Sequence, residues 1–217
     1  MDEIDYSGWQ ELLRAASEQV SAQHELLTKL DSVGGDGDHG TTMKRAMAAL
    51  RQACDDCAGP PPSALFNDAA WAIMGIDGGA TGPLLGSLFL GMSEAAGDAA
   101  TCDAMTLATV FEAGLGAVRR QTAAQPGDKT MLDALVPAVA AMGKAALAGA
   151  SPTACLEQAA DAAERGAAAT TDMEARHGRA RSLGARSIGS ADPGATSTSL
   201  MFRAFASAAA TLESEEE

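Results

Sequence analysis

The first long pattern in the chain is a run of apolar positions at helical spacing between residues 8 and 30. Its apolar members are Trp9, Leu12, Leu13, Ala16, Val20, Leu27 and Leu30. Ser7 stands just before the run, where a hydroxyl can accept a hydrogen bond from a free amide of the first turn. The pattern therefore predicts one helix over 8–30 with Ser7 as its N-cap.

Similar patterns predict seven further helices, each bounded by glycine, proline or a capping side chain. Ser63 is predicted to cap the third helix, Asp103 or Thr106 to begin the fifth, and Ser151-Pro152 and Asp192-Pro193 to open the last two. The predicted ranges are 41–57, 63–74, a helix that starts near Pro83, 103–122, 131–147, 152–171 and 193–212. No segment reads convincingly as a strand.

The junctions between these helices are unusual in their regular placement. Glycine-rich or proline-marked stretches occur at 31–43, 75–83, 125–131 and 178–194. In an antiparallel bundle, alternate loops lie at the same end, and these four are alternate loops. We therefore expect an all-α single domain of about eight antiparallel helices in a barrel-like bundle, with a binding site at one end.

Composition agrees with this architecture and excludes several function classes. Apolar residues make up 47% of the 217 positions but aromatic residues only 4%, which favours closely packed helices over a β sandwich. The formal charge of −14 and a pI near 4.5 argue against nucleic acid and anionic membranes as partners. With no targeting segment visible, we expect a cytoplasmic protein. The domain is expected over 1–212, with 213–217 as a disordered acidic tail.

The stretch 31–43 contains the strongest candidate chemistry. Asp31, Asp36 and Asp38 lie within eight residues, with glycines among them that allow a tight fold. Carboxylates this close repel one another unless a cation neutralises them, and an all-oxygen set suits Mg²⁺ or Ca²⁺ rather than zinc. A helix that begins directly afterwards offers free amides to a phosphate. The stretch therefore predicts a divalent-metal site that also holds a phosphate group.

Other readings of these motifs are weaker. Residues 35–40 match G-x-G-x-x-G, but a helix rather than a strand precedes them. An EF-hand fails because Met47 stands where a glutamate is required, and no Walker A spacing occurs. Cys54 and Cys57 form a lone C-x-x-C pair, which supports zinc only weakly. The remaining alternative is a plain Asp/Gly turn between helices, although such a turn does not need three aspartates and a histidine.

Basic residues are concentrated late in this acidic chain. Between positions 176 and 186 stand Arg176, His177, Arg179, Arg181 and Arg186. Arginine suits phosphate recognition because its planar fork matches phosphate oxygens. Ordinary surface arginines paired with acidic neighbours are the alternative.

Taken together, these stretches resemble the L subunit, the nucleotide-binding domain of dihydroxyacetone kinase. The resemblance lies in Gly35 to Met43, Gly78 to Pro83, Pro126 to Asp133, and Gly178 to Ala195, and it covers nearly the whole chain. Four ordered motifs with compatible spacing are more specific than any one of them. This chain departs from the family at Thr42 (usually Asn), Thr81 (usually Ser), Arg181-Ser182 (usually Ser-Tyr) and Ser190 (usually His).

The resemblance implies an eight-helix barrel that holds ADP or ATP at one end through two Mg²⁺ ions. It implies Asp31, Asp36 and Asp38 as metal ligands. It implies that the nucleotide is lined by His39, Gly40, Thr41, Thr42, Ala80, Thr81, Gly127, Met131, Arg179, Asp192, Pro193 and Gly194. No catalytic residue need be sought on this chain, because phosphoryl transfer requires positioning and charge neutralisation above all.

The implied partners follow from the same resemblance. Dihydroxyacetone would be held by a separate K subunit, and a phosphotransferase-system protein would supply the phosphoryl group to a bound ADP. The alternatives are an ATP-exchanging kinase component for a related short-chain sugar and an ADP-loaded regulatory subunit that binds a transcription factor. A fatty-acid kinase and a helical scaffold without ligand are further alternatives, and a homodimer is compatible with the sequence.

Overall fold

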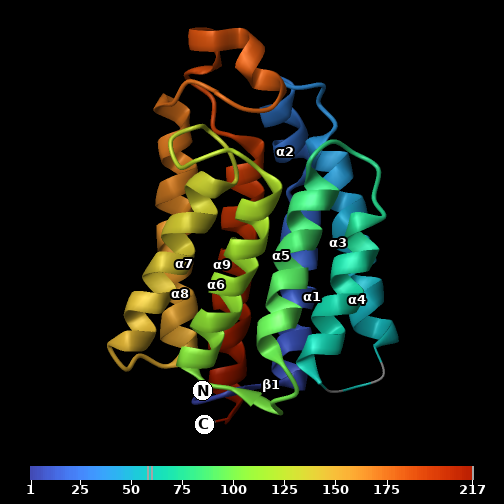
Figure 1. Cartoon of the computed structure of the whole chain (residues 1–217), viewed down its shortest axis with the longest axis vertical. Helices are drawn as coiled ribbons and strands as arrows, with labels where there is room; N and C mark the ends of the chain where they lie inside the picture. Colours follow the sequence, from blue (N-terminus) through green and yellow to red (C-terminus); the bar gives the residue numbers. More distant parts are fainter. Residues whose placement is uncertain (58, 60, 217) are drawn as a thin grey trace.

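The computed structural model describes residues 1–57, 59 and 61–216, and it confirms the predicted all-α fold (Figure 1). Within these residues there are nine α-helices, two 3₁₀ segments and two very short strands. The helices are α1 (Tyr6–Ala22), α2 (His24–Asp31), α3 (His39–Asp56), α4 (Pro62–Met74), α5 (Thr81–Ala96), α6 (Ala104–Gln121), α7 (Leu132–Leu147), α8 (Pro152–Ala169) and α9 (Pro193–Glu216). The 3₁₀ segments are η1 (Thr170–Asp172) and η2 (Arg179–Ser187), and the strands are β1 (Ile4–Asp5) and β2 (Thr101–Cys102).

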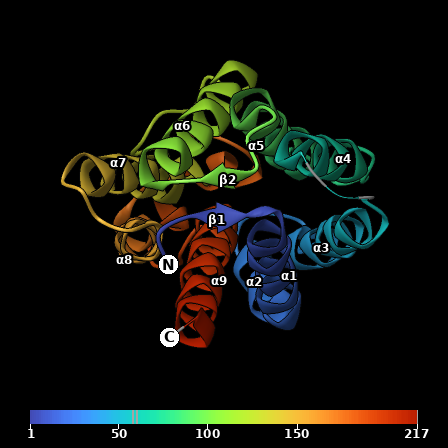
Figure 2. The ribbon, with the colours of Figure 1, turned by 90° about the horizontal axis from the view of Figure 1, so that it is seen from below.

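The helices form a closed ring. Contacts join α1 to α3, α3 to α4, and each following helix to the next as far as α9, which returns to pack on α1. The end-on view in Figure 2 shows this ring, with β1 and β2 crossing one end. The strands pair antiparallel through Ile4 with Cys102 and Asp5 with Thr101, although no convincing strand was expected. The result is the barrel-like bundle that the loop pattern predicts.

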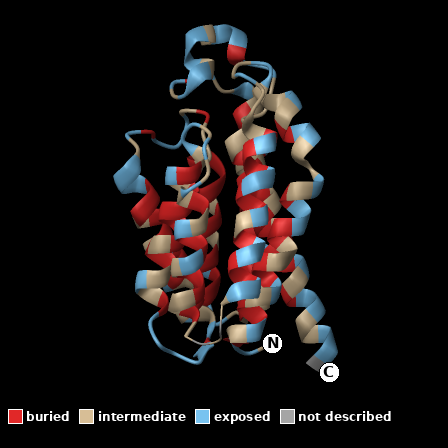
Figure 3. Ribbon diagram, turned by 90° about the vertical axis from the view of Figure 1, so that its right-hand side faces the viewer, coloured by how far each residue is buried: buried red, intermediate tan, exposed pale blue. Residues whose placement is uncertain are grey.

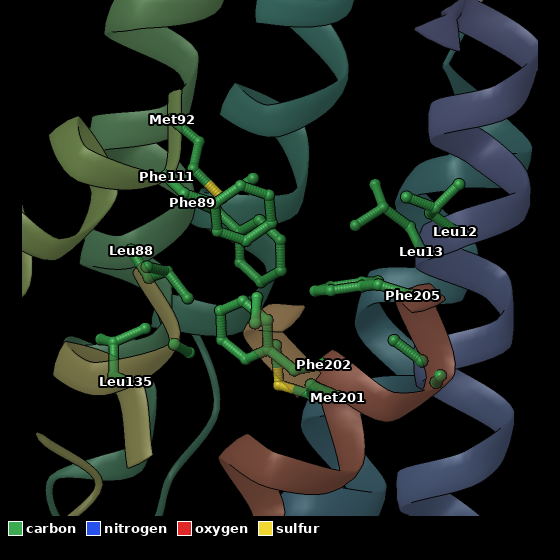
Figure 4. Close-up of a cluster of buried hydrophobic side chains, with 14 of the residues drawn as sticks. Leu12, Leu13, Leu88, Phe89, Met92, Phe111, Leu135, Met201, Phe202 and Phe205 are labelled. Atoms are coloured by element: carbon green, nitrogen blue, oxygen red, sulfur yellow. The ribbon is translucent and has the colours of Figure 1, made fainter. Parts of the chain in front are cut away.

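Apolar residues from every wall of the ring are buried in the interior. Figure 3 colours the buried positions of the helices red. Phe111 of α6 lies 5.3 Å from Phe202 and 6.0 Å from Phe205, both of α9, between ring centroids (Figure 4). Trp9 of α1 packs edge-on against Phe66 of α4 at 4.9 Å. Aromatic pairs at these distances stabilise beyond the area they bury. These five aromatic residues therefore join helices that are not neighbours in the ring.

The helix boundaries differ from the predictions at several positions. The predicted helix over 8–30 is two helices, because the chain leaves helical geometry at Gln23 (φ −97°, ψ 13°). The cap of α1 is Asp5, whose Oδ1 accepts from the amide of Gly8 at 2.8 Å, rather than Ser7. Helix α4 begins at Pro62 without a side-chain cap, so Ser63 is not its N-cap. Asp103 and Ser151 cap α6 and α8 as predicted.

The acidic C-terminal residues also differ from expectation. A disordered tail was expected over 213–217, but α9 continues to Glu216. The α-amino group of Met1 forms an ion pair with Glu213, which joins the two ends of the chain. Glu217 lies outside the described residues.

The bundle has two unlike ends (Figure 1). Both termini and the two strands lie at one end, and the junctions α2–α3, α4–α5, α6–α7 and α8–α9 lie at the other. Residues 173–191, which we call the strap, extend over this second end. None of the described helices is both long and apolar enough to cross a lipid bilayer.

Candidate functional site

A cavity of about 350 Å³ opens at the end where the four junctions meet. Each junction contributes to its lining, through Asp31 and Asp38, Ala80 and Thr81, Thr130 and Met131, and Asp192 to Gly194. The strap covers it with residues that include Arg179 and Leu183. The structure thus brings together the four stretches whose alternation the sequence analysis singled out.

The three aspartates of the first junction converge. One carboxylate oxygen from each of Asp31, Asp36 and Asp38 lies within 4.8 Å of the others, with Asp36 exposed and the other two half-buried. The turn is fixed by the carbonyl of Asp31, which accepts from Gly34 N at 3.2 Å and Gly35 N at 2.6 Å. Side-chain Oδ2 of Asp31 accepts from His39 N at 3.2 Å, which joins the acidic loop to the first residue of α3.

This donor set fits a hard divalent cation. Three carboxylates on one short loop supply oxygen ligands and leave the cavity side open for other ligands, as Mg²⁺ commonly requires. The guanidinium of Arg179 lies where such a cation would act, because Nη1 forms an ion pair with Asp36 and lies 3.9 Å from Oδ2 of Asp38. Among the described residues, these aspartates are the group whose geometry could hold a metal.

His39 stands between the acidic loop and the other junctions. Its Nε2 lies 3.1 Å from Ser197 Oγ, and its Nδ1 lies 3.5 Å from Thr81 Oγ1. Burial lowers the pKa of His39 below its ordinary value, although the charge of Asp31 acts in the opposite direction. At neutral pH the imidazole is therefore a neutral group that fixes the relative positions of α3, α5 and α9.

The second junction packs tightly on α3. A Cβ on Gly78 would lie 2.4 Å from Thr42 Oγ1, and the φ of Gly78 is +148°, so this position admits glycine alone without rearrangement. Arg45 donates to the carbonyl of Asp77 at 2.8 Å, which joins α3 to the same loop. These contacts present Ala80 and Thr81 to the cavity.

The third junction is stabilised by the buried side chain of Asp133. Asp133, in the first turn of α7, accepts from Gly127 N at 2.5 Å and from Thr130 N at 2.8 Å. Asp128 binds the strap, because its carbonyl accepts from Arg176 N at 3.1 Å and its Oδ2 lies 3.3 Å from His177 Nε2. The turn therefore connects α7 to the strap.

The fourth junction is the N-terminus of α9. Asp192 Oδ2 accepts from Ala195 N at 2.7 Å, as an N-cap does. Protein atoms surround this carboxylate, and burial raises the pKa of Asp192 to about 7. Pro193 and Gly194 follow in the lining of the cavity, where the positive end of the α9 dipole favours an anion.

Not every residue of the expected nucleotide set lines the cavity. The lining includes His39, Ala80, Thr81, Met131, Arg179, Asp192, Pro193 and Gly194, together with the three aspartates. Gly40, Thr41, Thr42 and Gly127 lie outside it. Gly40 packs on α2, where a Cβ would lie 2.0 Å from the carbonyl of His24, and Thr42 is fully buried against Gly78. Their expected direct role stays a prediction.

The sequence analysis missed several lining residues, among them Lys129, Ser197 and Met201. Lys129 lies within a recognised motif, but a buried lysine cannot be told from a surface one by pattern. Ser197 and Met201 lie one and two turns into α9, and helical spacing from Pro193 could have placed them on the same face. The four cysteines are free thiols, so the C-x-x-C pair forms no disulfide.

Comparisons with known proteins identify the family. The DAK2 domain profile matches residues 33–207 of this chain. A Listeria innocua protein, the ADP-binding subunit DhaL of PEP-dependent dihydroxyacetone kinase 1, is 38% identical, and the match covers 86% of this chain and 88% of that one. The corresponding Escherichia coli subunit is 36% identical, with 87% and 90% covered.

Solved structures agree with this relationship. The dihydroxyacetone kinase from C. freundii in complex with AMP-PNP and Mg²⁺ superposes with a TM-score of 0.69 at 25% identity over 91% of this chain. This chain spans about a third of that longer kinase, since 33% of it is covered. The chain therefore belongs to the DAK2-domain family, the family of the L-type subunits of dihydroxyacetone kinase.

Proposed function

We propose that this protein is the nucleotide-carrying L subunit of a dihydroxyacetone kinase, which presents the phosphoryl group of a bound nucleotide to a sugar held on another subunit. The observation that carries the proposal is the convergence of the three aspartates, Arg179 and the N-terminus of α9 on one cavity. The full-length likeness to two subunits named as ADP-binding supports it.

In this proposal Asp31, Asp36 and Asp38 would hold two Mg²⁺ ions, whose charge would neutralise that of the phosphates of ADP or ATP. Arg179 would donate to phosphate oxygens, for which its fork geometry is suited. The N-termini of α3 and α9 direct the positive ends of their helix dipoles at the same phosphates. A further set of residues positions the nucleotide, and its buried members act by supporting those that line the cavity. The set comprises His39 to Thr42, Ala80-Thr81, Gly127, Met131 and Asp192 to Gly194.

The titratable groups beside the acidic loop are engaged in holding that loop and α3 in place. The imidazole of His39 is engaged by Ser197 and Thr81, and Asp31 is engaged by the amide of His39. Phosphoryl transfer depends chiefly on positioning and electrostatic stabilisation, which this cavity can supply. The dihydroxyacetone is therefore assigned to a separate K subunit.

The strap offers a surface on which such a partner could dock. Arg181 and Arg186 are exposed, and neither has a carboxylate partner in the part of the chain that the structure describes. Because the chain as a whole is strongly acidic, this basic patch would orient an acidic partner surface toward the cavity. A charge reversal, Arg181→Glu with Arg186→Glu, should weaken the K subunit's binding, whereas Lys144→Glu on the far end of α7 should not.

The names of relatives of similar length support a phosphotransferase-system protein as the phosphoryl donor. Those relatives are named PEP-dependent, and a Lactococcus lactis subunit that is 33% identical over 92% of its own length is named PTS-dependent. We therefore assign a phosphotransferase-system protein as the donor, which implies a cytoplasmic location.

A second candidate is an ATP-exchanging component for a related short-chain ketose. The L-erythrulose 1-kinase of Mycolicibacterium smegmatis is 39% identical over 86% of this chain, although the match covers only 33% of that kinase. Sugar choice would then depend on the subunit that holds the sugar.

The nucleotide carried by the purified protein tests the proposal. Protein purified in Mg²⁺ buffer is denatured, the released nucleotide is identified, and exchange of labelled ATP into the native protein is followed. Stoichiometric ADP that resists exchange supports the phosphotransferase-linked subunit, and freely exchanging nucleotide supports the second candidate. Absence of bound nucleotide, with no binding after addition, contradicts both.

A further inference from the structure

Lys129 is buried in an unusual backbone conformation. Its exposed fraction is 6%, and its φ is +62°, which makes it the one non-glycine residue at positive φ among the described residues. Side chains larger than hydrogen seldom adopt this conformation, and where they do the surrounding structure holds them there. Here the left-handed turn directs the lysine side chain inward, beneath the strap.

The ammonium of Lys129 joins the two ends of the strap. Nζ donates to the carbonyl of Met173 at 3.1 Å, at one end, and to the carbonyls of Ser187 at 2.5 Å and Ser190 at 2.7 Å, at the other. An ammonium has three N–H donors, so these three acceptors use all of them. A single side chain therefore bonds to both ends of the strap.

Other contacts also hold the ends of the strap: Arg176 N donates to the carbonyl of Asp128 at 3.1 Å, and His177 Nε2 lies 3.3 Å from Asp128 Oδ2. Ala175 N donates to Ser187 Oγ at 2.8 Å, which holds the same two ends together, and Gly189 N donates to the carbonyl of Thr171 at 2.8 Å. The central part carries Arg179 and reaches the acidic loop, where a Cβ on Gly34 would lie 2.8 Å from the Cβ of Ala180. The position of Arg179 over the cavity thus depends on how the two ends are fixed.

We infer that Lys129 is a positioning residue, which holds the strap closed so that Arg179 faces the phosphates of the bound nucleotide. The inference rests on the proposed function for the identity of the ligand. Lys129 itself need not touch the nucleotide, because its three donors are directed at carbonyls of the strap. Loss of the ammonium would leave three carbonyl groups without their donor and would free both ends.

The test compares Lys129→Met with the wild type and with Lys144→Met, an exposed lysine on α7 away from the cavity. Hydrogen exchange of the apo proteins is measured first, because it needs no ligand. In Lys129→Met we expect amides of 173–190 to exchange about tenfold faster while those of α1 and α9 keep their rates, as for local opening. Lys144→Met should match the wild type in both regions.

Dissociation of a fluorescent ADP analogue in Mg²⁺ buffer gives the second readout. Lys129→Met should release it about tenfold faster, and Lys129→Arg, which keeps a cationic donor, should lie closer to the wild type. If Lys129→Met does not fold, the same two measurements are made on Lys129→Gln, whose amide retains two N–H donors.

Three results would overturn the inference. These are unchanged exchange in the strap, an equal acceleration of exchange in strap and core, and an analogue release rate equal to that of Lys144→Met. If the wild type binds no nucleotide, the proposed function fails, but the exchange comparison still decides whether Lys129 holds the strap.

Discussion

The acidic loop, residues 31–38, and the strap face each other across the cavity and are built in opposite ways. The acidic loop is local: its three carboxylates lie close in sequence, and its turn is closed by bonds from Gly34 and Gly35 to Asp31. The strap is held from a distance, by Lys129 and Asp128 of another junction. A metal-binding loop can thus be formed by neighbours in sequence, whereas the arginine opposite depends on the assembled fold.

The largest effect is expected from the acidic loop. Asp36→Asn removes a charged ligand, so Mg²⁺ and the nucleotide that it bridges should bind at least about a hundredfold more weakly. A ligand at 100 times its Kd stabilises a protein by about 2.7 kcal/mol, and this stabilisation should be lost. Thermal unfolding with and without Mg²⁺-ADP measures it.

The apo protein is the control for that substitution. Without ligand, Asp36→Asn should unfold at or slightly above the wild-type temperature, because it relieves repulsion among three close carboxylates. A nucleotide-induced shift equal to that of the wild type would contradict the metal assignment.

A smaller effect is expected from the strap. Arg179→Ala removes one charge-assisted contact to phosphate and leaves the metal ligands in place, so affinity for ADP should fall about tenfold. Titration calorimetry measures the affinity, and Arg181→Ala, a neighbour on the same segment, is the matched control. Equal affinities for the wild type and Arg179→Ala would remove this arginine from the site.

Asp192 should make the apo protein sensitive to pH. Because burial raises its pKa to about 7 in the folded state, the folded protein binds more protons than the unfolded chain between pH 4 and 7. Stability from this group is therefore present at low pH and is lost as pH rises to about 7. Asp192 is only half-buried and lines the open cavity, so solvent reduces the effect and we expect a loss of about 1 kcal/mol.

The Asp192→Asn variant separates the titration of Asp192 from the titration of other groups. The amide oxygen can still cap α9, but it does not titrate. Denaturant unfolding of both proteins at pH 5 and pH 7.5 should show a smaller loss in the variant. Parallel pH profiles for the two proteins would contradict the assignment.

The smallest effect concerns the contact between the two regions. Gly34→Ala places a methyl 2.8 Å from Ala180 Cβ, so the strap must shift, and ADP affinity should fall a few-fold. Ala180→Gly in the same protein removes the opposing methyl and should restore affinity. If the double variant binds no better than Gly34→Ala alone, the contact does not couple the regions.

These differences also explain which features of the structure could be predicted from the sequence. The approximate positions of most helices, the four junctions and the aspartate cluster were predicted because periodicity, glycine and charge are local signals. The break at Gln23 was missed since neither glycine nor proline marks it, and Asp5 displaced Ser7 as cap because β1 sets where α1 begins. The role of Lys129 depends on carbonyls some 44 to 61 positions away, which no local pattern specifies.

The central claim is that the acidic loop and the strap hold one metal-bound nucleotide between them. Hydrogen exchange with and without Mg²⁺-ADP tests it most directly. We predict slower exchange in 31–42, 76–83, 125–131 and 173–194 together, with no change in the β1–β2 end, and loss of the whole effect when Mg²⁺ is omitted. Protection of the acidic loop without the strap, or protection at the opposite end, would contradict the account.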